Sequence, residues 1–170
     1  IVSEAYYINL KEENTKIQDL KEIFEDEEIK KIGIDLGRVY ILLKQEGIEL
    51  KGINYDASIA AYILNPTNNK LKLTDLAEQY LEIDINEILG NSSEQKGQQI
   101  NLFDAMQTIE ESDEKLKEEN AKKLESEKYA LYSYIIYKLQ EVTMKKLEEI
   151  NAVELFNKIE SLDENVSKSM

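Results

Sequence analysis

The segment of residues 33–66 constrains the fold most strongly, because it alternates strand and helix signals with turn residues between them. Its sequence is GIDLGRVYILLKQEGIELKGINYDASIAAYILNP. Residues 31–34 and 53–55 read as short strands, and an apolar helix over 57–64 must end before Pro66. The order strand, helix, strand, helix predicts an α/β half for this domain.

The two helices of this segment have recognisable ends. Val39, Leu42 and Leu43 recur at helical spacing and predict an apolar stripe on a helix that stops at Gly47. Asp56 directly precedes the second helix, where an aspartate accepts hydrogen bonds from the first backbone N–H groups. We therefore favour a capping role for Asp56 over a metal-binding one.

The first 25 residues predict strand followed by helix. Residues 1–10 are rich in β-branched and aromatic side chains and predict one or two strands around Glu4. Asn14 or Thr15 is placed to cap the next helix. The apolar face of that helix would consist of Ile17, Leu20, Ile23 and Phe24.

The second half of the chain changes character. Thr74 is expected to cap a helix, and the polar, glycine-containing residues 90–99 to form a loop. Residues 112–170 contain no Gly or Pro and predict one long helix or two abutting ones, with Asn151 capping a last pair. Their apolar positions are Leu116, Leu124, Leu131, Ile135, Leu139, Val142 and Leu147.

Composition excludes several kinds of chemistry. The chain of 170 residues contains neither Cys nor His, so disulfides, thiol nucleophiles and histidine-based acid–base catalysis are ruled out. A length of 170 residues fits a single domain, and no apolar run suggests a membrane span. The absence of Cys fits a cytoplasmic protein.

Three stretches carry a resemblance to a known family. They are GIELKGINYDASIAAYILNP at 47–66, LTDLAEQYL at 73–81 and, more weakly, LFNKIESLDENVSKSM at 155–170. The chain resembles the 3′–5′ proofreading exonuclease domain of bacterial DNA polymerase I, a ribonuclease-H-like fold. The resemblance implies a mixed sheet flanked by helices within one domain over 1–170. It also implies a first strand upstream of Ile1 and a polymerase domain beyond Met170.

The resemblance also implies which residues would carry chemistry. Active members bind two divalent cations through four carboxylates: an Asp-x-Glu on the first strand, an Asp at a helix start and an Asp one turn beyond a Tyr. Here the Asp-x-Glu strand would precede the chain, and Glu4 is the only acid in the opening strand. The second motif ends on Val39, and the third keeps Tyr129 but places Ser133 at the ligand position.

These substitutions predict a degenerate site without a cofactor. Val39 cannot bind a metal, and the neutral oxygen of Ser133 is a poor ligand for Mg²⁺ or Mn²⁺, which a working site would need. Asp35 could replace a missing carboxylate, but the resemblance places it at an Asn position, so we favour a turn or capping role. No catalytic or metal-binding residue is therefore expected.

Net charge bears on DNA binding. The formal charge of −14 repels phosphate, so weak or no binding of DNA is expected from this domain alone. Four tyrosines could stack on bases, although packing on a helix is the alternative that we favour. They are Tyr129, Tyr132, Tyr134 and Tyr137.

Three functions remain open at this point. The first is a vestigial exonuclease domain with a structural role beside the polymerase domain of the same polypeptide, which would contact DNA in replication and repair. The second is an active two-metal exonuclease. The third is an acidic helical interaction module unrelated to polymerases, which would lack a strand-containing half.

Overall fold

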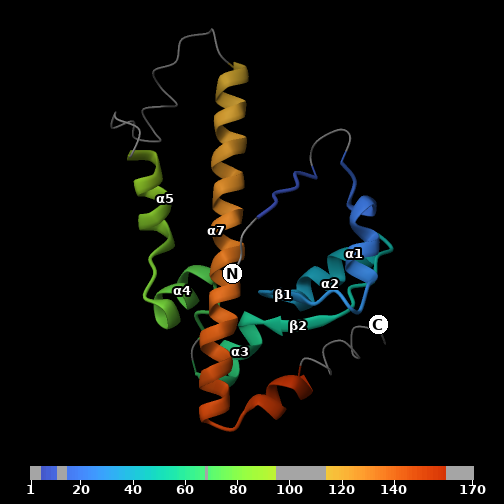
Figure 1. The fold of residues 1–170 in the computed structure, drawn as a ribbon, viewed down its shortest axis with the longest axis vertical. Coiled ribbons are helices and arrows are strands. Elements are labelled where there is room, and N and C mark those ends of the chain that lie inside the picture. Colours follow the sequence, from blue (N-terminus) through green and yellow to red (C-terminus); the bar gives the residue numbers. More distant parts are fainter. Residues whose placement is uncertain (1–4, 11–14, 68, 95–113, 160–170) are drawn as a thin grey trace.

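A small parallel sheet lies beside one long helix (Figure 1). The structure is a computed structural model that describes residues 5–10, 15–67, 69–94 and 114–159. In that part of the chain the sheet consists of β1 (Lys31–Gly33) and β2 (Ile53–Asp56), which pair in parallel. The crossover between them runs through α2 (Leu36–Gln45), and this βαβ unit confirms the α/β half that the sequence predicted.

Helices make up most of the described chain. The other helical elements are η1 (Ile17–Leu20), α1 (Lys21–Glu25), α3 (Ala57–Leu64), α4 (Leu73–Leu81), α5 (Ile85–Glu94), α7 (Glu114–Glu149) and an unlabelled helix over 153–159. Helix α7 is continuous, so the predicted helical second half contains one long helix. Both α3 and α4 pack against it, and α7 also contacts β1.

The main core lies between α7 and the layer formed by β2, α3 and α4. Its buried side chains are Tyr55, Ala57, Ala60, Ala61, Leu76, Ala77, Ile85, Ile135, Leu139, Leu147, Ala152 and Phe156. The hydroxyl of buried Thr143 donates to the Leu139 carbonyl oxygen at 2.7 Å, so the Tyr55 hydroxyl, 2.9 Å from Thr143 Oγ1, acts as the donor to it. This polar contact fixes β2 against one turn of α7.

A second, smaller core lies under α2. Tyr40, Leu43, Ile48 and Leu50 are buried there, and Val39 packs against them. Helix α2 ends at Gln45, and Gly47 adopts a left-handed conformation with φ 73°, as its predicted role as a stop requires. Leu42, which the sequence placed on the apolar stripe, is instead 54% exposed because its helix face turns away from both cores.

The Asp56 carboxylate joins the starts of two helices. Its Oδ1 accepts from the backbone N–H groups of Ser58 at 2.7 Å and Asp35 at 3.2 Å, and its Oδ2 accepts from Leu36 at 2.6 Å. The carboxylate is 3% exposed and lies at the amino ends of both α3 and α2, where partial positive charge favours an anion. The predicted cap of α3 is therefore confirmed, and the clamp on α2 is an addition that the sequence did not reveal.

Several sequence predictions at the amino-terminal end were wrong. Residues 5–10 form no strand, and residues 1–4 lie outside the described chain, so the predicted mixed sheet appears as two parallel strands in the part that is described. The first helical turn begins after Lys16, whose backbone N–H donates to Asp19 Oδ2 at 3.0 Å, rather than after Thr15. Asn14, the other predicted cap, lies outside the described residues.

Thr74 does not cap α4, because that helix begins one residue earlier at Leu73. The Lys72 carbonyl accepts from the Leu76 N–H at 3.0 Å, so Thr74 already lies within the first turn. Packing of Leu73 against the main core provides a physical reason for the earlier start. In this case burial of an apolar side chain outweighs the capping preference of threonine.

Residues 90–94 are helical rather than part of a loop. They form the second half of α5, whose start is capped by Asp84 through the N–H groups of Asn86 and Glu87. The remainder of the predicted loop, 95–99, lies outside the described residues. Asn151, with φ 54°, terminates α7 instead of capping the next helix, which starts after Ala152.

We expect Asp56→Ala to lower the free energy of unfolding by about 2–4 kcal/mol, because three backbone donors lose a buried acceptor. Urea denaturation followed by circular dichroism measures the change. Asp84→Ala is the matched control, since it removes an exposed cap from one helix and should cost about 1 kcal/mol. Equal losses in the two variants would show that Asp56 does not clamp α2.

Removal of the Tyr55–Thr143 hydrogen bond should also destabilise the fold. We expect Tyr55→Phe and Thr143→Val each to cost about 1–2 kcal/mol, because each leaves a buried polar group with one partner fewer. The double variant should cost less than the sum of the two single changes. Strict additivity in thermal denaturation would contradict a direct coupling between β2 and α7.

Candidate functional site

The amino end of α2 carries the first candidate positions. Asp35 adopts a left-handed conformation with φ 54° and ψ 46°, and its backbone carbonyl accepts from Arg38 and Val39 at 3.1 and 3.3 Å. Its backbone N–H is also bonded to Ser58 Oγ at 3.2 Å. Asp35 therefore occupies the predicted turn and cap position through its backbone. Its exposed carboxylate makes no hydrogen bond or ion pair within the described residues.

Val39 lies one helical turn further along α2. Its side chain is half-buried and packs against the small core of Tyr40, Leu43, Ile48 and Leu50. Position 39, where the resemblance places a metal-binding carboxylate, thus holds an aliphatic side chain in an apolar environment. A carboxylate at this position would have to lose part of its hydration, which opposes its ionisation.

Tyr129 and Ser133 lie on successive turns of α7. The Ser133 hydroxyl donates to the Tyr129 carbonyl oxygen at 3.0 Å, so its proton is committed to the backbone of its own helix. Both side chains are exposed. Such back-bonding is common for serine within helices and provides no negative charge for a cation.

The Tyr129 ring belongs to an aromatic cluster that the sequence did not reveal. The Tyr7 ring stacks on it with centroids 5.6 Å apart and planes at 3°, and Tyr132 meets it edge-on at 5.8 Å. The Lys128 ammonium lies 5.6 Å from the centroids of both α7 tyrosines. Tyr7 is 122 residues away in sequence, so no local pattern could have indicated this contact.

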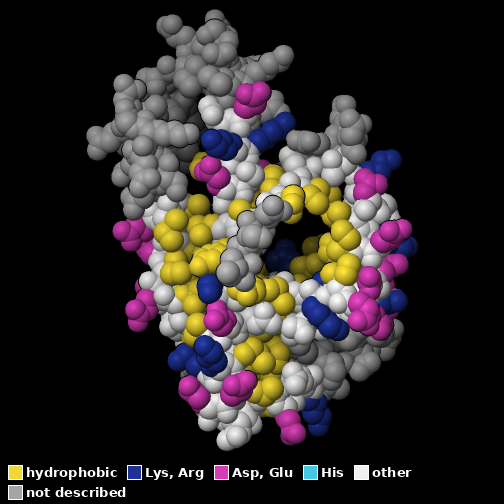
Figure 2. Space-filling model, viewed as in Figure 1, with side chains coloured by type: hydrophobic (Ala, Val, Ile, Leu, Met, Phe, Trp, Pro, Cys, Tyr) yellow, Lys and Arg dark blue, Asp and Glu magenta, His cyan; other side chains and the backbone are white. Residues whose placement is uncertain are grey.

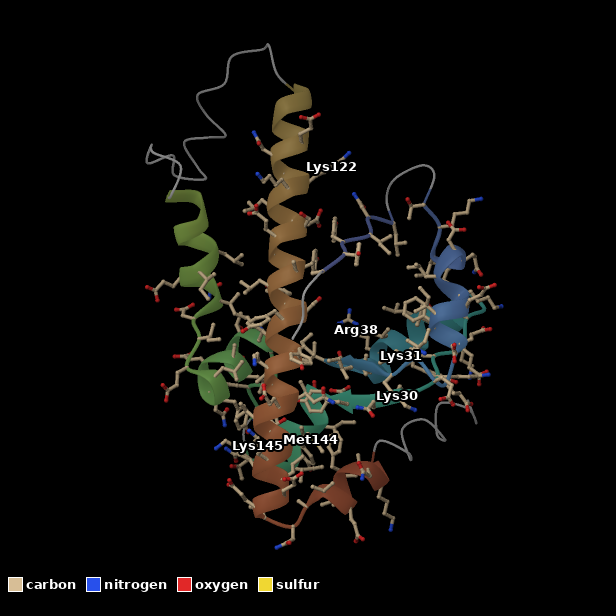
Figure 3. All side chains as sticks on the ribbon, in the orientation of Figure 1. Lys30, Lys31, Arg38, Lys122, Met144 and Lys145 are labelled. Atoms are coloured by element: carbon tan, nitrogen blue, oxygen red, sulfur yellow. The ribbon has the colours of Figure 1, made fainter. Side chains whose placement is uncertain are left out.

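A hollow with apolar walls opens beside α2. Figure 2 shows hydrophobic side chains around an opening, and Figure 3 shows Arg38 pointing into the space between α2, α7 and residues 5–10. A cavity of about 680 Å³ lies between α2 and the η1–α1 segment, and its lining includes apolar Phe24 and Val39 and charged Lys16 and Glu46. Apolar side chains therefore surround the opening, and Arg38 points into it.

Arg38 differs from the lysines near the sheet. Lys30 Nζ donates to the Glu27 carbonyl oxygen at 3.1 Å, and Lys31 Nζ donates to that of Asp26. Partial burial lowers the pKa of the Lys31 ammonium, although the Asp26 carboxylate acts in the opposite direction. The Arg38 guanidinium makes no such bond within the described residues, so its charge is not neutralised there.

The described residues do not assemble a cluster of metal ligands. No group of three or more acidic, His or Cys side chains among them could hold an ion. Glu4, the acid that the sequence offered from the opening segment, lies outside the described residues. Nor does any helix of the described chain have the length and apolarity to cross a membrane.

Comparison with known proteins agrees with the α/β half of the fold. A family described as "DNA polymerase I, ribonuclease H-like domain" matches residues 2–89, more than half of the chain. The chain belongs to this family. The match includes β1, α2, β2, α3 and α4, whereas α7, with Tyr129 and Ser133, lies outside it.

One relative of this ribonuclease-H-like domain is the DNA polymerase I of Bacillus subtilis (strain 168). The two are 38% identical over 76 residues, which is 45% of this chain and 8% of the relative. The chain thus spans a small fraction of that polymerase's length. Membership of the family overturns the third hypothesis, an acidic module unrelated to polymerases.

Positions 39 and 133 should respond differently to truncation. We expect Val39→Ala to lower the free energy of unfolding by about 1 kcal/mol, because it removes two methyl groups from a half-buried site. Ser133→Ala should change it by less than about 0.5 kcal/mol, since the hydroxyl is exposed and bonded only within its helix. Chemical denaturation of both variants measures this, and a larger loss for Ser133→Ala would contradict the packing described here.

Proposed function

We propose that this chain is a vestigial 3′–5′ exonuclease domain, which retains the family's scaffold without hydrolysing DNA. The observation that carries the proposal is the packing of Val39 against the small core under α2. A two-metal site needs negatively charged oxygen ligands on both cations. An aliphatic side chain at one of these positions removes a ligand and contributes its area to the core instead.

Local charge supports the same proposal. Arg38 immediately precedes the degenerate position and points into the opening beside α2 (Figure 3). Its permanent positive charge would repel a divalent cation held nearby. Ser133 adds no compensating charge, because its hydroxyl is neutral and bonded to Tyr129.

The remaining role of the domain would be architectural. In this proposal it supports the polymerase domain of the same polypeptide, and the parent enzyme rather than this domain makes the main contacts with DNA during replication and repair. The rigid parts suit this role, since Asp56 ties α2 to α3 and Tyr55 ties β2 to α7. A cytoplasmic location would follow from the parent's work on DNA.

The proposal predicts no Mg²⁺- or Mn²⁺-dependent shortening of a 5′-labelled single strand, because two ligand positions lack a carboxylate. Denaturing gels over a time course measure this, with a metal-dependent 3′–5′ exonuclease as positive control. Calorimetric titration of Mn²⁺ into the protein should likewise show no pair of tight sites. Degradation that is lost in Asp35→Asn would refute the proposal.

An active exonuclease is the second candidate, and the exposed carboxylate of Asp35 is the observation that favours it. Asp35 lies one turn from Val39, and its carboxylate makes no hydrogen bond or ion pair in the described chain. In this alternative Asp35 and an acid near Ser133 would replace the missing ligands, beside an Asp-x-Glu strand upstream. Asp35→Asn would then abolish hydrolysis, whereas Asp84→Asn, a change to the acid that caps α5, would leave it unchanged.

A further inference from the structure

The Tyr7–Tyr129 stack points to a role for the amino-terminal segment. We propose that Tyr7 is an intramolecular plug, which occupies the face of Tyr129 on which a nucleobase of a single strand would otherwise stack. The inference rests on the proposed function in that it takes Tyr129 as a remnant of the exonuclease motif. It adds that this remnant is covered by a side chain of the same polypeptide.

The geometry of the stack resembles that of a bound base. The two rings are nearly parallel, at 3°, with their centroids 5.6 Å apart. Nucleobases also lie flat on aromatic side chains when proteins bind single strands without sequence preference. At this spacing the Tyr7 ring is offset over part of the Tyr129 face, so a base could stack fully on this face only after Tyr7 had left it.

The surroundings of Tyr129 would otherwise suit a nucleotide. Its side chain remains 43% exposed in spite of the stack, and Tyr132 supports it edge-on from the next turn of α7. The Lys128 ammonium lies over both rings and could contact a backbone phosphate. An exposed aromatic with an adjacent cation is the usual composition of a single-strand site.

The segment that carries Tyr7, residues 5–10, could leave α7 without loss of secondary structure. Residues 5–10 belong to no helix or strand, so their departure would break no backbone ladder in the described chain. Tyr7 is half-buried, whereas its neighbour Tyr6 is 84% exposed. The ring stack on Tyr129 is therefore one attachment of this segment to α7.

The test measures binding of a fluorescein-labelled dT octamer by anisotropy, in low salt and EDTA so that no hydrolysis can occur. We expect Tyr7→Ala to bind the octamer at least about 5-fold more tightly than the original chain, because a base can then stack on Tyr129. Tyr129→Ala in the Tyr7→Ala background should cancel the gain. Tyr6→Ala is the matched control and should change nothing.

Two further measurements separate stacking from other causes. An abasic octamer with the same phosphates should bind no more tightly to Tyr7→Ala than to the original chain. An increase in its affinity equal to that of the dT octamer would overturn the proposal. Tyr7→Leu, which keeps bulk without a ring, should open the site as Tyr7→Ala does if the alanine variant folds poorly. Circular dichroism verifies folding of each variant.

The stack itself can be observed by NMR. The Tyr7 ring resonances should shift in Tyr129→Leu, because the ring current of Tyr129 is lost. Equal octamer binding by Tyr7→Ala and the original chain, with this shift present, would overturn the plug while leaving the absence of nuclease activity untouched. Conversely, metal-dependent degradation by a Tyr7→Ala protein that binds more tightly would refute the proposed function and leave the plug standing.

Discussion

The buried carboxylate of Asp56 is the contact on which the rest of the described fold depends. It lies at the end of β2, where its two oxygens accept from the first N–H groups of α2 and α3. An anion between two helix amino ends satisfies donors that neither helix can satisfy itself. Because Tyr55, the preceding residue, is bonded to Thr143 on α7, two adjacent residues fix the sheet, both helices and the long helix together.

The Asp56 contact also determines how the side chains of the candidate site are oriented. Asp56 sets where α2 begins and hence the helical phase in which Val39 faces the small core. Ser133 and Tyr129 come from α7, which is held by a different set of contacts in the main core. In the described residues the scaffold is therefore specified by caps and packing that do not involve a metal.

Sequence reasoning succeeded where one local feature determines the backbone. The βαβ order, the end of α2 at Gly47, the Asp56 cap and the limits of α3 follow from turn and cap chemistry and were predicted.

Sequence reasoning failed where burial of apolar side chains overrode such local preferences. Thr74 lies inside a helix that begins at partly buried Leu73, and residues 90–94 extend a helix capped by Asp84. Residues 5–10 have the composition of a strand and still form no strand.

The sequence alone predicted an α/β half and excluded His and Cys chemistry. It also placed Val39 and Ser133 at the positions where the resemblance implies carboxylates. These are statements about residue identity and order. Only the tertiary structure decided that Asp56 clamps two helices, that Arg38 points into an apolar opening, and that Tyr7 stacks on Tyr129. The reason is physical: these contacts join residues 20 to more than 100 positions apart, and their geometry exists only once the cores have packed.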